Sequence, residues 1–196
     1  FSAIIILCML TGVLLFVGGA NRTCLIVVAV LAAAALAALL LSGGYTSDRI
    51  MAWRAPERYA SDEGYQILQS EYAIGSGGLL GLGFGKGRQK YLYLPEEHND
   101  YIFAVVCEEL GFIGAVAILL LFALLIIRGF WIAIHARDRF SMLLGVGLTA
   151  LLAIQVILNV AVVTNLLPST GISLPFFSSG GTALVMQLAE CGIMLN

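Results

Sequence analysis

The chain has 196 residues, of which 60% are hydrophobic and 11% charged, and its formal net charge is −2. With a mean hydropathy of +0.98, the chain carries too much apolar surface for a soluble fold of this length, so a lipid bilayer is expected to act as its solvent. It contains no tract of Lys and Arg, which argues against a nucleic-acid partner.

Two apolar runs open the chain, at 1–17 and 23–41, and each is close to the roughly 20 residues of a membrane-spanning helix. The short polar turn at 18–22 predicts that these two spans are antiparallel. The chain begins without Met inside one apolar run and stops inside another. We therefore expect both ends to be cuts through a longer protein.

Residues 42–99 are rich in charged residues and glycine, and we expect them to form one large loop outside the hydrocarbon. Apolar character returns in three further runs, at 101–127, 140–163 and 182–196. The sequence therefore predicts an all-α fold, a polytopic integral membrane helical bundle with five transmembrane segments. The connection 164–181 contains prolines and glycines suited to a re-entrant or tightly folded loop packed against protein.

The short connections between spans carry arginines: Arg22, Arg128, Arg137 and Arg139. Short basic turns face the cytoplasm in membrane proteins, whereas long loops count little in this rule. The 42–99 loop is therefore expected to face outward.

Asp100 lies where the large loop enters the third span, in a cluster of ionisable residues at 96–100. A carboxylate in such a half-dry place can have a shifted pKa, which makes Asp100 a candidate general base. The alternative is that Asn99 or Asp100 is simply the N-cap of the span. Both interpretations stay open at this point.

Glu108 and Glu109 lie two turns further into the same span, at a depth where a carboxylate needs a partner or a wet cavity. At about 100° per residue, they cannot cluster with Asp100 on one helix face. We interpret them as helix-packing or cavity residues before catalytic ones.

The glycine-dense stretch 75–90 ends in three cations, Lys86, Arg88 and Lys90. Backbone N–H groups and cations together are suited to binding a pyrophosphate. A flexible loop with a basic rim on lipid head groups is an equally good interpretation.

Two later spans have polar stripes, formed by Gln155 and Asn159 in the fourth and by Gln187 and Glu190 in the fifth. Such residues either join helices or line a cavity.

Several long motifs occur in one order along the chain, and with them the sequence resembles the FtsW/RodA/SpoVE (SEDS) family. The resemblance covers essentially the whole chain and implies the last five of ten helices, closest to the FtsW/SpoVE branch. Asn99 and Ser179 depart from residues common among relatives, and neither departure touches Asp100. The motifs are Tyr65–Ser70, Ile74–Gly78, Leu94–Phe103 and Leu167–Gly181.

The resemblance implies a peptidoglycan glycosyltransferase that polymerises lipid II at the bacterial cytoplasmic membrane during cell division, sporulation or cell-wall growth. It places the catalytic acidic residue at Asp100, as general base of an inverting displacement of undecaprenyl pyrophosphate. Lys86, Arg88, Lys90 or a divalent cation, Mg²⁺ or Mn²⁺, would stabilise the departing pyrophosphate. Further substrate-binding residues are expected within the matching motifs: Gln66, Ser76, His98 and Ser178.

The implied partners are a class B penicillin-binding protein and membrane lipids, besides the substrate lipid II. Two other functions stay open. One is a lipid II flippase or transporter, in which deep polar residues such as Asn159 and Glu190 line a head-group path. The other is a non-catalytic scaffold of the division machinery, in which Asp100 is a helix cap and nothing more.

Overall fold

The computed structural model describes residues 2–41, 45–59, 63–87 and 100–195. These residues form helices and connecting segments without a strand among them, so the predicted all-α fold is confirmed. In chain order the elements are α1 (Ser2–Val17), α2 (Arg22–Leu41), α3 (Tyr45–Arg54), the 3-10 helix η1 (Pro56–Tyr59), α4 (Glu63–Gly77), α5 (Ile102–Ile134), α6 (Arg139–Val163) and α7 (Gly181–Leu195).

Five of these helices occupy the five predicted spans. Helices α5 and α6 are long and apolar enough to cross a membrane, and the apolar parts of α1, α2 and α7 are shorter. Leucines of α5 such as Leu121 and Leu124 stay more than half exposed, as expected for a surface that faces lipid. That all five helices cross the bilayer stays a prediction.

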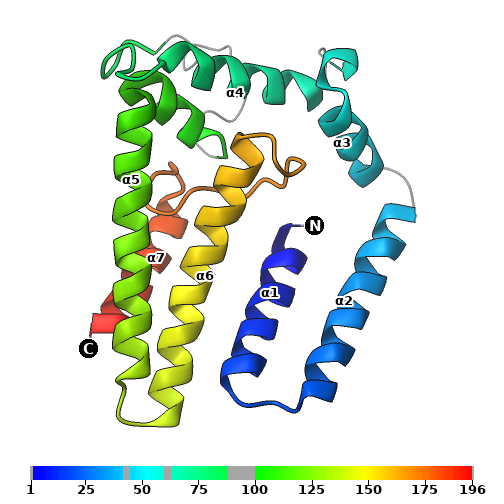
Figure 1. Ribbon diagram of the computed structural model, residues 1–196, viewed down its shortest axis with the longest axis vertical. Coiled ribbons are helices and arrows are strands. Elements are labelled where there is room, and N and C mark those ends of the chain that lie inside the picture. The colour runs from blue at the N-terminus through cyan, green and yellow to red at the C-terminus, as the bar shows by residue number, and fades with distance from the viewer. Residues whose placement is uncertain (1, 42–44, 60–62, 88–99, 196) are drawn as a thin grey trace.

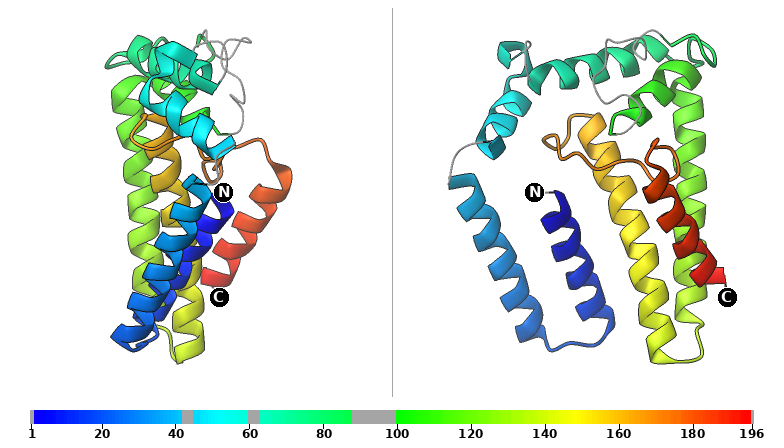
Figure 2. Two further views of the ribbon diagram at one scale, coloured as in Figure 1. Left: turned by 90° about the vertical axis from the view of Figure 1, so that its right-hand side faces the viewer. Right: turned by 180° about the vertical axis from the view of Figure 1, so that it is seen from behind.

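The two short turns lie at one end of the bundle, and helices α3 and α4 lie at the opposite end (Figures 1 and 2). Helix α4 runs across the ends of α5 and α6, and the 164–180 connection lies beneath it. Residues far apart in sequence therefore meet at this end of the molecule, where Asp100 also lies.

The third span is longer than predicted. Helix α5 does not break at Arg128 but continues to Ile134. The Arg128 guanidinium lies 4.5 Å from the centroid of the Trp131 ring. This cation–π contact on the helix surface lets the charged residue stay within the helix.

The segment expected as one large loop contains ordered structure. Helices α3 and α4 and the 3-10 helix η1 occupy most of its described part. One face of α4 is buried, including Ile67, Ser70 and Ala73. Helix α4 thus packs as a lid on the bundle, a role hidden by the charged and glycine-rich composition around it.

Helix α5 is interrupted at Gly111, whose φ of 67° and ψ of −172° are not helical. The glycine-rich segment after α4 packs against this break. The N–H groups of Leu82 and Gly83 donate to the carbonyls of Glu108 and Glu109, at 3.0 Å each. The segment therefore satisfies carbonyls that the broken helix leaves without helical partners.

The second half of α5 is capped by the same segment. The N–H groups of Phe112 and Ile113 donate to the carbonyls of Gly78 and Leu79, at 2.9 and 3.2 Å. A methyl group at Gly111 would overlap the backbone of Leu79 and Gly81. Glycine is therefore required where the two backbones meet.

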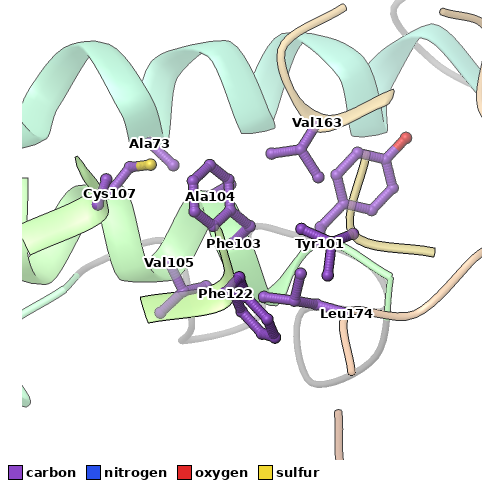
Figure 3. Packing of buried hydrophobic residues seen from close by; sticks show 11 residues of the cluster. Ala73, Tyr101, Phe103, Ala104, Val105, Cys107, Phe122, Val163 and Leu174 are labelled. Carbon is purple, nitrogen blue, oxygen red and sulfur yellow. The ribbon is translucent and has the colours of Figure 1, made fainter. Parts of the chain in front are cut away.

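The core beneath α4 joins the first half of α5 to α6 and to the 164–180 connection (Figure 3). Tyr101, Val163 and Leu174 are each at most 2% exposed. They come from three separate segments, so their packing fixes the start of α5 against the rest of the fold. Asp100 immediately precedes this anchored residue, Tyr101.

Candidate active site

Asp100 does not occupy the N-cap position of α5. The N-cap residue is Tyr101, with φ of −106° and ψ of 15°, and its side chain makes no capping hydrogen bond. The helix therefore begins one residue later than a cap at Asp100 requires. Asn99, the other candidate cap, lies outside the described residues.

The carboxylate of Asp100 lies against the 164–180 connection. A methyl group built on Gly171 would lie 3.3 Å from the Asp100 Oδ2 atom. Gly171 has a φ of 69°, a conformation that residues with a Cβ rarely adopt. Glycine thus gives the carboxylate a close approach to the backbone at this point.

Asn159 of α6 joins the two sides of this contact. Its Nδ2 group donates to the backbone carbonyl of Asp100 and to that of Ile172, at 2.7 Å each. On the other side, the Arg49 guanidinium of α3 donates to the Ser169 carbonyl at 3.0 Å. The residues 169–172 are therefore held from two helices and form a wall beside Asp100, which we call the 169–172 wall.

The remainder of the connection is held in the same way, by side chains bonded to its backbone. Trp53 Nε1 donates to the carbonyl of Asn165 at 3.0 Å, and Asn165 Nδ2 donates to Glu71 Oε1 at 2.8 Å. At the α7 side, Gln187 Oε1 accepts from the N–H of Phe176 at 2.8 Å. The expectation of a tightly folded loop packed against protein is confirmed.

The two predicted carboxylates deeper in α5 are buried, Glu108 at 1% and Glu109 at 8% exposure. Glu109 Oε2 accepts the N–H of Gly85 at 2.9 Å. A methyl group at Gly87 would lie 2.8 Å from Glu108 Oε2, so the glycine-rich segment covers both side chains. These contacts fit the prediction that such deep carboxylates need partners.

The glycine-rich segment therefore donates backbone hydrogen bonds to α5. The N–H groups of Leu82, Gly83 and Gly85 already donate to Glu108 or Glu109. These three N–H groups are not available to cradle a pyrophosphate. Lys86 at the end of the segment is exposed.

The other predicted substrate-binding residues are not joined to Asp100 by the contacts described above. The Ser76 hydroxyl donates to the Ala73 carbonyl of its own helix at 3.0 Å, and Ser76 is exposed. Gln66 and Ser178 are half-buried. The three remaining candidates lie outside the described residues: Arg88, Lys90 and His98.

Among the residues that the structure describes, no three His, Cys, Asp or Glu side chains gather as a metal site would require. The acidic and histidine residues at 96–98 fall outside that part of the chain. The expected Mg²⁺ or Mn²⁺ is therefore untested.

Sequence reasoning treated Asn159 as one member of a polar stripe and overlooked Arg49 and Gly171. The signal for Asn159 was an amide inside an apolar span, where a polar group needs a partner. Its partners, 59 and 13 residues away, could not be inferred from spacing. Gly171 lies within the Leu167–Gly181 motif, but nothing in the local sequence indicates its contact with Asp100.

A family model described as cell cycle protein, covering FtsW, RodA and SpoVE, matches residues 1–196. The chain is 45% identical over 184 residues to Stage V sporulation protein E of Bacillus subtilis, covering 94% of this chain and 50% of that protein. It is 41% identical over 195 residues to a probable peptidoglycan glycosyltransferase FtsW of Trichlorobacter lovleyi, covering 100% and 51%.

A third relative is the peptidoglycan glycosyltransferase MrdB of Escherichia coli, 44% identical over 153 residues, covering 78% of this chain and 41% of that protein. One solved structure is similar with a TM-score of 0.76 and 29% identity, covering 97% of this chain and 53% of that one. It is described as "Structural coordination of polymerization and crosslinking by a peptidoglycan synthase complex". The chain spans about half the length of the curated relatives it matches.

Proposed function

Because the chain belongs to the FtsW/RodA/SpoVE family of cell cycle proteins, we propose that the full-length protein is a peptidoglycan glycosyltransferase of the bacterial cytoplasmic membrane. It polymerises lipid II into glycan strands on the outer face, with Asp100 as general base. Relatives named as peptidoglycan glycosyltransferases support the activity. The observation that carries the role of Asp100 is its placement against the 169–172 wall, away from the N-cap position of α5.

In the proposed reaction, the Asp100 carboxylate accepts the proton of a sugar hydroxyl on one lipid II molecule. The hydroxyl oxygen attacks the anomeric carbon of another lipid II, and the configuration at that carbon inverts. The bond to undecaprenyl pyrophosphate breaks, and the pyrophosphate leaves with the bonding electron pair. One base is enough, because the leaving group departs as an anion and needs no proton.

Cations near the site would stabilise the pyrophosphate as its charge develops. Arg49 is added to the sequence-based candidates Lys86, Arg88 and Lys90, because its guanidinium contacts the 169–172 wall. A planar guanidinium suits phosphate recognition through paired hydrogen bonds. A divalent cation, Mg²⁺ or Mn²⁺, would supply further neutralisation, and no step above depends on it.

The similar solved structure belongs to a complex that polymerises and crosslinks peptidoglycan. By analogy, the partner of this protein is a class B penicillin-binding protein that crosslinks the strands it makes. Membrane lipids surround the exposed apolar faces of its helices.

Lipid II transport is the main rival function, and it would use the polar stripes of α6 and α7 as a head-group path. Asn159 and Gln187 instead bond to the backbone of the 164–180 connection. These two side chains hold the fold together, which leaves the transport interpretation with less support than catalysis.

The test is to purify the full-length protein with its penicillin-binding partner, supply lipid II, and compare strand formation by the native protein and Asp100→Asn. The amide keeps the shape of the carboxylate but cannot accept the proton. We expect polymerisation to fall by about 100-fold or more, in line with general-base losses of 10²–10⁴.

The matched control is Glu71→Gln, which removes a carboxylate charge at the same end while its Oε1 can still accept from Asn165. Its polymerisation should match the native rate. Native activity in a folded Asp100→Asn protein would remove the general-base role. If the native protein makes no polymer either, transport or scaffolding takes the place of catalysis.

A further inference from the structure

We infer that Asn159 is a positioning residue of this reaction: it holds the backbone of Asp100 to that of Ile172 and so sets where the carboxylate lies. The inference rests on the proposed role of Asp100 as general base. It concerns a residue of α6, two turns or more from any motif used to recognise the family.

Only one orientation of the Asn159 side-chain amide is compatible with the atoms around it. Its Nδ2 group lies 2.7 Å from two carbonyl oxygens, those of Asp100 and Ile172. The flipped amide would place Oδ1 against both carbonyls, and three acceptors would then face one another without a hydrogen. Both amide hydrogens are therefore committed, one to each side of the site.

Asn159 is 0% exposed, so its two donated bonds are shielded from bulk water. Burying a polar group without a partner is unfavourable, and both amide hydrogens have a partner here.

The two donated bonds fix the distance between the Asp100 carboxylate and the 169–172 wall, on which the proposed catalysis depends. Asp100 precedes α5, and Ile172 follows Gly171, whose backbone faces the carboxylate. Without the amide, the two carbonyls would repel each other and the start of α5 could move away from the wall. A displacement of about 1 Å at a reacting group can lower a rate by about 100-fold.

The experiment compares four variants with the native full-length complex on lipid II: Asn159→Ala, Asn159→Asp, Asn165→Gly and Asp100→Asn. Asn165→Gly is the matched control, because it removes another side-chain amide of the same connection, a half-buried one bonded to Glu71. Glycine also accepts the positive φ of 58° at that position. Folded fraction and melting temperature are measured for each variant.

We expect Asn159→Ala to lower kcat by about 10- to 100-fold, with KM for lipid II within about twofold of native. Asn165→Gly should stay within about twofold in both. Asn159→Asp keeps the side-chain shape, donates nothing when ionised and donates one hydrogen bond when protonated. Its kcat relative to native should therefore rise as pH falls, a response that a purely structural residue would not show.

Native kcat in folded Asn159→Ala would overturn the inference, as would a change confined to KM. If Asn159→Ala does not fold, Asn159→Asp decides: a native rate with a native pH profile overturns the positioning role, and a shifted profile supports it. Asp100→Asn separates the two claims. If that variant keeps its activity, the general-base proposal fails, whatever Asn159 does.

Discussion

Gly171 is the residue at which one added methyl group should disturb the site most. The methyl would lie 3.3 Å from Asp100 Oδ2, and the φ of 69° costs a residue with a Cβ about 1–2 kcal/mol. We expect Gly171→Ala to lower kcat of polymerisation at least about tenfold, measured with lipid II. Gly181→Ala, with no atom within 4 Å of the added group, is the control, and equal rates in both variants would contradict the close approach.

Asp138 gives a prediction about pH at the other end of the bundle. Its carboxylate accepts from the N–H and the hydroxyl of Ser141 as the N-cap of α6, and the bond from the Ser141 N–H holds the pKa of Asp138 below its ordinary 3.8. Because the folded-state pKa is lowered, the cap stabilises fully above 3.8, and the effect is lost as pH falls through the lowered pKa.

The measurement is the melting temperature of the native protein and of Asp138→Ala, from about pH 7 down to pH values below the Asp138 pKa. The native protein should melt higher at about pH 7, and the gap should narrow as pH falls below the Asp138 pKa. Asp138→Asn keeps a capping oxygen without an ionisable group, so its gap to Asp138→Ala should not change with pH over this range. A gap between the native protein and Asp138→Ala that stays constant down to strongly acidic pH would show that the carboxylate is not the stabilising group.

At the scale of elements, the break in α5 depends on how closely the glycine-rich segment approaches it. A methyl group at Gly81 would overlap the Glu109 carbonyl, whereas one at Gly78 would meet nothing within 4 Å. Both glycines have positive φ, so Gly78→Ala carries the conformational cost alone, about 1–2 kcal/mol. Gly81→Ala should lower the free energy of unfolding further, because its methyl group would disturb the bonds from Leu82 and Gly83. These bonds contribute about 0.5–1.5 kcal/mol each.

Comparing the free energies of unfolding of these two variants of the full-length protein tests the role of the segment. Equal losses would mean that the backbone contact with α5 contributes nothing.

The elements also show which features the sequence could predict. Apolar runs located α1, α2, α6 and α7 to within two residues, because a spanning helix must be apolar over its whole length. The predicted end of α5 was wrong, because the sequence prediction ended the helix at Arg128. This residue instead lies on the surface of the continuing helix, over the Trp131 ring. The break at Gly111 was not predicted, because its caps come from a segment about 30 residues earlier.

At the scale of the molecule, the candidate site is assembled from segments that no local pattern connects. Asp100 was found from sequence because an acidic residue at a helix entrance has a recognisable chemistry and matches a family motif. The wall beside it required the fold, since Arg49, Asn159 and Gly171 come from three separate segments. Most of these contacts end on backbone carbonyls. Every residue has such a carbonyl, so residue identity does not show which ones accept a hydrogen bond.

The orientation of the whole molecule decides whether this site can meet lipid II on the outer face. The short turns lie at one end and α3 and α4 at the other (Figure 1), where Asp100 is bonded to Asn159 near the C-terminal end of α6. Exposed residues at the two ends should therefore label from opposite sides. In a cysteine-free variant of the full-length protein, in which the four cysteines of this chain are replaced along with any others, Tyr59→Cys should react with a membrane-impermeant maleimide on intact spheroplasts. Arg137→Cys should react only after permeabilisation, because arginine-bearing short turns are retained in the cytoplasm. The reverse pattern would put Asp100 on the cytoplasmic side, where strands made at this site could not join the wall, and the proposed function would fail with the topology.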